Sequence, residues 1–135
     1  MAEAIARDAI DRGVVDLAGS LFVASAGVMA HEGSPVAAEA ISTLNRLGIE
    51  HRGIAKRLSP DMVRRADLVL AMTEAHALAA RRLVEGDPAA EAKIQQLDLD
   101  ADIEDPIGLG QFAYDEVAAR FRELIPRRLA EALRT

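Results

Sequence analysis

Apolar residues recur along the chain with two different spacings, and the alternation predicts both helices and strands. Residues 2–12 carry apolar side chains at helical spacing and are followed by Gly13, which favours a helix that ends there. The run "SLFVASA" (20–26) is short, apolar and partly β-branched, and "DLVLAM" (67–72) has the strongest strand pattern in the sequence. These patterns predict one helix and two buried strands.

Capping residues indicate where three further helices begin. Ser-Pro at 34–35 supplies an N-cap and a proline for the first helical position, and predicts a helix that ends at Gly48. Ser-Pro at 59–60 repeats this arrangement before a short helix. Thr73 is predicted to cap a helix that ends at Gly86.

The last third of the chain contains a weaker strand and a long helix. Asp-Pro at 87–88 is typical of a turn, and "KIQQL" (93–97) predicts a strand. An acidic loop follows at 98–111. The final amphipathic helix is expected at 112–133, with a kink or a break at Pro126.

Strands that alternate with helices of ten or more residues predict an α/β fold. The expected architecture is an open parallel sheet with helices on both faces, of the flavodoxin type, in a single domain covering residues 1–135. Ligands in such sheets bind beyond the carboxyl ends of the strands. The candidate site therefore consists of loops 25–35, 72–76 and 98–111.

Composition excludes several classes of function. The net charge is −6, and no Lys/Arg cluster is interleaved with aromatic residues, so a nucleic-acid partner is not expected. No apolar run approaches the ~18 residues of a membrane span, and the first residues are unlike a signal peptide, so we expect a cytoplasmic protein with no membrane contact.

The sequence contains no cysteine, which excludes disulfides, thiolate metal sites and thiol nucleophiles. His31, His51 and His76 have no metal-ligand spacing, so neither a metal nor a cofactor is expected.

Three segments of the chain resemble a known family. "SAGV" at 25–28, "LSPDMVRRADLVLAMTEAH" at 58–76 and "DIEDPIGLGQFAYDEV" at 102–117 follow one another as in low-molecular-weight protein-tyrosine phosphatases. The bacterial branch that includes protein-arginine phosphatases is the most similar, and thiol-dependent arsenate reductases are a weaker match. The resemblance runs nearly end to end.

The resemblance implies a reaction that this sequence does not support by itself. In the family, a loop with the pattern Cys-x5-Arg between the first strand and the first helix binds the phosphoryl group, and its thiolate forms a cysteinyl-phosphate. In typical members the letters "MAEA" come directly after this loop, and here they are residues 1–4. The chain is therefore expected to be N-terminally truncated relative to the family. It would lack the family's first strand, which lies in the middle of the sheet, together with the cysteine and the arginine of the loop. Three strands would remain.

Four residues are assigned to the site by the resemblance. Asp105, before the proline of "DP", corresponds to the general acid that protonates the leaving group, although its residue type alone favours an ordinary turn. Ser25 corresponds to a residue that braces the phosphate loop. Met29 and His31 lie in the segment that gates the substrate.

The neighbours of Asp105 in the acidic loop are also candidates by residue type. A paired acid/base site would need two carboxylates held together. Asp102 and Glu104 are predicted instead to be solvated loop charges.

Three functions stay open. The first is a family member without phosphatase activity. The second is an active hydrolase of a phosphoprotein or a small phosphate ester, whose N-terminal strand and loop are missing because of a misassigned start or a truncation. The third is a binding or dimerisation module. In that case the place of the first strand, between 20–26 and 67–72, is closed by direct pairing, by a second copy, or by a partner's strand.

Overall fold

The protein is described by a computed structural model that covers residues 1–13, 23–27, 37–50 and 56–133. Its helices and strands, in chain order, are α1 (Ala2–Asp11), α2 (Ala38–Arg46), α3 (Pro60–Arg65), β1 (Val69–Ala71), α4 (Glu74–Leu83), α5 (Pro88–Glu91), β2 (Ile94–Gln96) and α6 (Gln111–Leu133).

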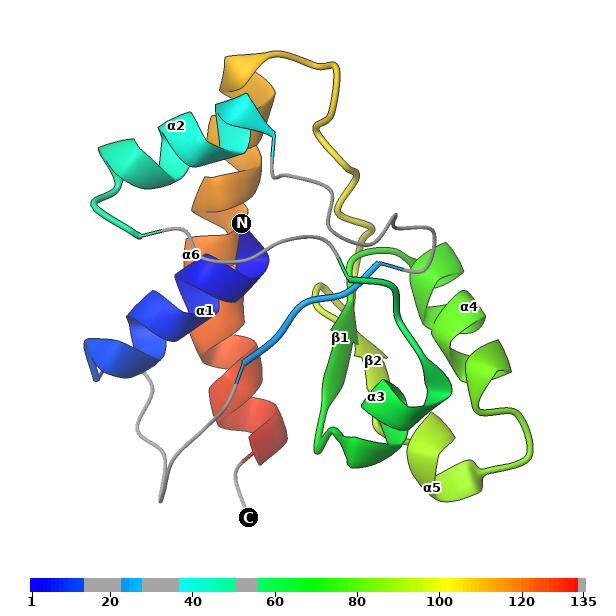
Figure 1. Cartoon of the computed structure of the whole chain (residues 1–135). Coiled ribbons are helices and arrows are strands. Elements are labelled where there is room, and N and C mark those ends of the chain that lie inside the picture. The colour runs from blue at the N-terminus through cyan, green and yellow to red at the C-terminus, as the bar shows by residue number, and fades with distance from the viewer. Residues whose placement is uncertain (14–22, 28–36, 51–55, 134–135) are drawn as a thin grey trace.

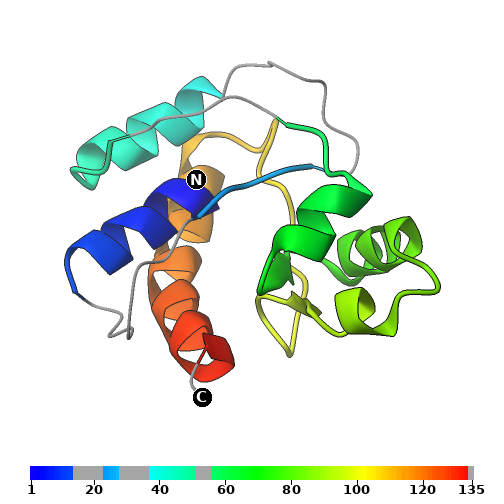
Figure 2. The same cartoon turned by 60° about the horizontal axis from the view of Figure 1, so that its bottom comes forward.

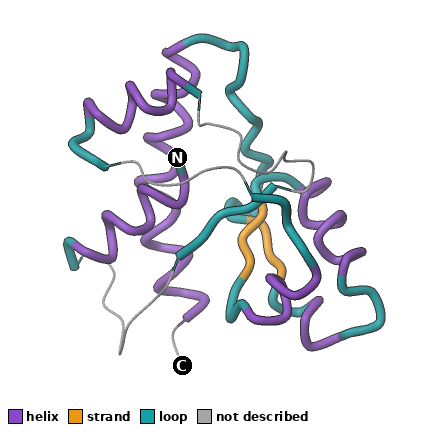
Figure 3. The backbone as a smooth tube through the Cα atoms, viewed as in Figure 1, coloured by secondary structure: helices purple, strands orange, loops and turns teal. Residues whose placement is uncertain are grey.

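The helices lie on two sides of a small parallel sheet. Figure 1 shows α1, α2 and α6 on one side of β1 and β2, with α3, α4 and α5 on the other, and the turned view in Figure 2 keeps this division. Figure 3 shows the two strands side by side between the groups of helices. The α/β fold expected from the sequence, with parallel strands and helices on both faces, is confirmed.

The two strands pair in parallel, as the alternation of strands and helices predicts. Val69 lies opposite Ile94 and Ala71 opposite Gln96, in parallel orientation. Both residues of the first pair have buried or half-buried side chains, because each face of the sheet is covered by helices. The strands expected at 67–72 and 93–97 are thereby confirmed.

The strand expected at 20–26 is not formed in the part that the structure describes. Residues 23–26 belong to no strand, and Gly27 alone makes an isolated parallel bridge, with Arg57. The main-chain oxygen of Val23 accepts a hydrogen bond from the Arg7 guanidinium at 2.9 Å. A side chain of α1 thus occupies an acceptor that a neighbouring strand would otherwise use.

The caps predicted for α3 and α4 are present. Ser59 Oγ accepts a hydrogen bond from the Met62 N–H at 3.3 Å, and Thr73 Oγ1 accepts one from the His76 N–H at 3.1 Å. Each hydroxyl satisfies one of the N–H groups that the first turn of a helix leaves free.

Three other features of the helices differ from expectation. α2 begins at Ala38 with Ala37 as its N-cap, and the predicted Ser-Pro start lies outside the described residues. Asp87 is a helix cap instead of a simple turn residue, because its Oδ1 accepts from the Ala90 N–H and α5 follows. α6 continues through Pro126 as one helix and is not split. Its buried side chains before and after the proline stabilise it there.

The core consists of two clusters. The first cluster joins α1 and α6 and comprises the buried residues Ala4, Ile5, Ala6, Ala9, Leu44, Ile49, Leu97, Ile103, Ala118, Phe121, Leu124, Ile125 and Leu129. The second cluster joins the sheet to α3, α4 and α5 and comprises Val63, Ala71, Ala77, Ala80, Val84, Ala90 and Ile94. Aliphatic side chains dominate both, as the composition predicts.

Within the described ranges, no helix is both long enough and apolar enough to cross a membrane.

Candidate functional site

The acidic loop 98–110 crosses the carboxyl ends of the two strands. The Ile103 N–H donates to the Met72 C=O at 2.8 Å, directly after β1, and the Ile103 side chain is buried in the first cluster. Ligands of parallel sheets bind at this edge. The loop is therefore held where the sequence places the candidate site.

Asp102 fastens the same loop to the start of α4 and to the end of β2. Its Oδ1 accepts from the Glu74 N–H, at the start of α4, and from Gln96 Nε2, at the end of β2, both at 2.9 Å. The prediction of a solvated loop charge is wrong for Asp102, although the residue is exposed. Glu74 lies 28 residues before Asp102 in the sequence, so no local pattern indicates the contact with α4.

Asp105 is exposed and forms a turn within its own loop. Its Oδ1 accepts from the Ile107 N–H at 3.0 Å, while Pro106 beside it is buried. This is the Asx-turn geometry that the residue type predicts. It leaves the second carboxylate oxygen of Asp105 available to solvent or to a ligand.

Tyr114 lies in the first turn of α6, directly after the loop, and is affected by the charge of Asp105. The tyrosine is 4% exposed. Burial, followed by the negative charges of Asp105 and Glu39, raises the pKa of the Tyr114 phenol above its ordinary value. The phenol therefore stays neutral at neutral pH.

Ser25 contacts the first turn of α1. Its Oγ donates to Glu3 Oε1 at 3.1 Å, and Glu3 also pairs with Arg7 at 3.5 Å. Ser25 thus braces the helix start, but no hydrogen bond or ion pair among the described residues joins it to Asp105. The other two predicted site residues, Met29 and His31, lie outside the described residues.

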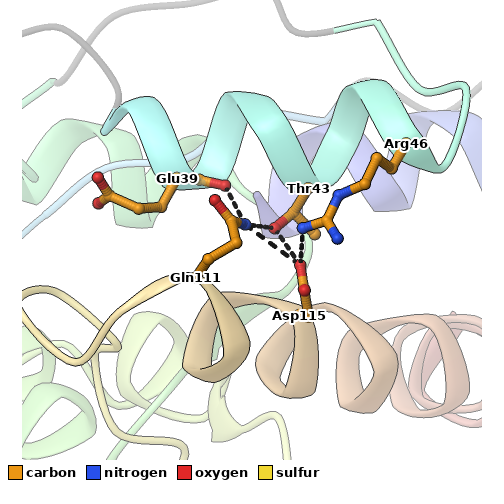
Figure 4. A network of polar contacts seen from close by, with 5 residues as sticks. All are labelled: Glu39, Thr43, Arg46, Gln111 and Asp115. Carbon is orange, nitrogen blue, oxygen red and sulfur yellow. Dashed lines mark hydrogen bonds and ion pairs between the residues drawn. The ribbon is translucent and has the colours of Figure 1, made fainter.

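A polar network holds the far end of the acidic loop, where α6 begins. Figure 4 shows the side chains of α2 and α6 converging on Asp115. Asp115 Oδ1 accepts from Thr43 Oγ1 at 2.7 Å, from Arg46 Nη2 at 2.6 Å and from Gln111 Nε2 at 3.2 Å. Gln111 Nε2 also donates to the Glu39 C=O at 2.9 Å. Sequence analysis missed this network, because its contacts between α2 and α6 join residues that are 68 to 72 positions apart in the sequence.

The network predicts a pH-dependent contribution to stability. Hydrogen bonds from Thr43, Arg46 and Gln111 hold the pKa of Asp115 below its ordinary value of 3.8. The contribution is therefore present above pH 3.8 and is lost as the pH falls through the lowered pKa. We expect Asp115→Asn to lower the urea midpoint at neutral pH, and the difference from wild type to shrink in acid.

Urea denaturation of wild type and Asp115→Asn at several pH values between neutral and about pH 3 measures this loss of stability. The loss depends on pH because the pKa of Asp115 differs between the folded and the unfolded state. Glu116→Gln is the matched control, since Glu116 is the exposed neighbour on the same helix. A difference between Asp115→Asn and wild type that stays constant over this range contradicts the linkage to Asp115.

The whole chain, residues 1–135, matches the family model described as "Low molecular weight phosphotyrosine protein phosphatase". The chain belongs to this family. Its α/β fold agrees with that membership, and the resemblance seen in the sequence is confirmed.

Solved structures of bacterial phosphatases are similar over nearly the full chain. YwlE arginine phosphatase from Geobacillus stearothermophilus is 34% identical, with a TM-score of 0.79, and the match covers 98% of this chain and 82% of that one. A low-molecular-weight protein tyrosine phosphatase from T. tengcongensis is 32% identical, with a TM-score of 0.79 and coverage of 96% and 88%. A YwlE mutant with a phosphorylated active-site serine is 26% identical, with a TM-score of 0.84 and coverage of 99% and 86%. No curated protein sequence matches.

The described residues contain no group of three or more His, Cys, Asp or Glu side chains that could hold a metal ion.

Proposed function

We propose that the 135-residue chain is a family member without phosphatase activity. The observation that carries this proposal is the complete absence of cysteine from the sequence. In the related YwlE mutant, the residue that carries phosphate is an active-site serine. The family reaction proceeds through a covalent phosphoryl intermediate, and this chain offers no thiolate to form it.

Asp105 does not compensate for the missing nucleophile. General acid catalysis contributes typically ~10²–10⁴-fold, whereas phosphate-monoester hydrolysis needs acceleration of up to about 10²¹-fold. The Asp105 carboxylate also holds its own turn through Ile107. Its role in this chain is structural.

Assays of phosphate hydrolysis test the proposal directly. We expect the purified chain to hydrolyse neither p-nitrophenyl phosphate nor phosphoarginine above the buffer rate, and Asp105→Asn to leave both rates unchanged. Glu104→Gln is the control, because Glu104 is an exposed carboxylate of the same loop. Turnover that Asp105→Asn abolishes and Glu104→Gln preserves would overturn the proposal.

A second candidate is an active phosphatase with additional residues before Met1. It is favoured by the coverage of the three relatives, whose chains extend beyond the matched 82% to 88%. Its substrate would be a phosphoprotein or a small phosphate ester, with phosphoarginine suggested by the two YwlE structures. The reading frame upstream of codon 1 decides this candidate. An in-frame Cys-x5-Arg-Ser/Thr-Pro sequence supports it, and a stop codon or unrelated sequence rules it out.

An inactive member of the family would function by binding a partner protein. A chain that keeps the fold and loses the reaction still presents the loop surface and the sheet edge to partners. The protein would act in the cytoplasm, as a homodimer or with a partner that supplies a strand.

A further inference from the structure

The segment that joins the acidic loop to α6 exposes three large apolar side chains. Ile107 is 67% exposed, Leu109 68% and Phe112 74%. Single apolar side chains are common on protein surfaces, but these three follow one another within one short segment and form an apolar patch. Figure 1 shows this segment at the outer edge of the molecule, where the chain enters α6. Exposed apolar patches mark places where another molecule binds.

The backbone under the apolar patch is held by its own hydrogen bonds. Asp105 Oδ1 accepts from the Ile107 N–H at 3.0 Å. The Pro106 C=O accepts from the Leu109 N–H, also at 3.0 Å. Gly108 between them has a φ of 77°, a left-handed conformation that other residues rarely adopt. A patch fixed in this way loses little conformational freedom when a partner binds it.

Negative charge precedes the apolar patch along the chain. Residues 98–105 contain five Asp or Glu residues, and residues 98–112 contain no Lys or Arg. Asp98 forms an ion pair with Arg120 at 2.8 Å. In the part of the chain that the structure describes, the other four carboxylates have no ion pair. The loop therefore presents unneutralised negative charge to a partner.

Carboxylates also lie on both sides of the apolar patch. Besides burial, the charge of Asp105 raises the pKa of the Tyr114 phenol, so this carboxylate lies close to the first turn of α6. Phe112 belongs to the same turn. Glu116 is exposed one helical turn further on, and residues four apart are neighbours on a helix surface. The patch thus has Asp105 on one side and Glu116 on the other.

The charge around the apolar patch determines which partner fits it. A second copy of this chain would bring the same carboxylates against each other, because a symmetric dimer uses one patch twice. Like charges that meet across an interface are unfavourable. Nucleic acids and anionic lipid surfaces would be repelled in the same way. A polypeptide with Lys or Arg beside its apolar side chains complements both the patch and its charged borders.

We propose that the apolar patch is a docking surface for a basic protein partner, which presents apolar side chains between Lys or Arg residues. Burial of the patch supplies the affinity, with Phe112 as the aromatic anchor. Asp105 and Glu116 attract the basic groups and orient the partner. This inference rests on the proposed function, because it gives the binding role a partner of defined chemistry.

A labelled peptide tests both requirements, apolar and basic. The probe is fluorescein-labelled Lys-Arg-Leu-Phe-Lys-Leu-Ile-Lys-Arg, and fluorescence anisotropy follows its binding to the full chain. One control peptide has Glu at every basic position, and the other has Ser at every apolar position. We expect saturable binding of the probe, with both controls at least ~10-fold weaker. Failure of the probe to bind, or equal binding of either control, would refute the proposal.

Substitutions locate the peptide on the surface. Phe112→Ala should weaken binding of the probe at least ~5-fold, and Asp105→Asn combined with Glu116→Gln at least ~3-fold. The matched controls are Leu78→Ala, at an exposed apolar residue of α4 on the other side of the sheet, and Glu85→Gln, at an exposed carboxylate after α4. Both should bind the probe as wild type does. Equal losses in the control variants would mean that the peptide binds apolar or acidic surface in general, which overturns the proposed site.

Sedimentation and the phosphatase assays separate this inference from the alternatives. A dimer of the wild-type chain that Phe112→Ala dissociates would place a second copy on the apolar patch and overturn the proposal. Phosphatase turnover would remove the proposed inactivity without changing the peptide result. Loss of the peptide result would leave the inactivity intact, so the two can fail independently.

Discussion

Replacing Arg128 with methionine is expected to lower the free energy of unfolding by about 3 kcal/mol. Arg128 is 5% exposed, and its guanidinium donates to the Leu97 C=O at 3.0 Å and to the Gln96 C=O at 3.2 Å. It also donates to Gln95 Oε1 at 2.7 Å. Methionine fills similar space but leaves these oxygens without a donor. Because small domains have only about 5–15 kcal/mol of stability, the loss should be obvious in urea denaturation.

The adjacent residue provides the control. Arg127 is exposed on the same turn of α6, so Arg127→Met should change the unfolding free energy by no more than about 0.5 kcal/mol. Similar losses for the two variants would mean that helix propensity or net charge, and not the contacts at the end of β2, determines the effect.

Truncating Phe121 should have an equally large effect. Phe121 is 5% exposed and belongs to the first cluster, where α6 packs on α1. Phe121→Ala removes a large apolar side chain and leaves a cavity, and such substitutions cost about 3–5 kcal/mol. Thermal and urea denaturation should show the loss, with unchanged circular dichroism below the transition.

Phe112 permits a comparison within the same helix. It is 74% exposed, so Phe112→Ala changes the same atoms but removes almost no buried contact. We expect a change within about 0.5 kcal/mol. If Phe112→Ala destabilised the protein as strongly as Phe121→Ala, the first cluster would not be the source of the effect.

Sequence reasoning predicted those features whose causes are local. Ser59 and Thr73 cap their helices through N–H groups three residues away, so the pattern contains both partners. Asp105 binds an N–H two residues away, and its turn followed from residue type alone. Its assignment as a general acid came from the family resemblance instead.

Features that depend on tertiary contacts could not be predicted. The Asp102 carboxylate holds a helix start 28 residues earlier, and Thr43 reaches Asp115 across 72 residues. No spacing rule connects positions so distant. The apolar run at 20–26 predicts a strand, but residues 23–26 form none. A strand needs a neighbouring strand, and the Val23 C=O accepts a hydrogen bond from the Arg7 side chain of α1 instead.

The two-cluster core has a consequence for how the molecule unfolds. Alternate residues of β1 face different clusters. The three residues of β1 and their partners in β2 therefore separate the half that contains α1 and α6 from the half that contains α3 to α5. Each half has its own buried set of side chains, and the strands contribute side chains to both. We therefore expect amide exchange to show different protection in the α1 and α6 half and in the α3 to α5 half.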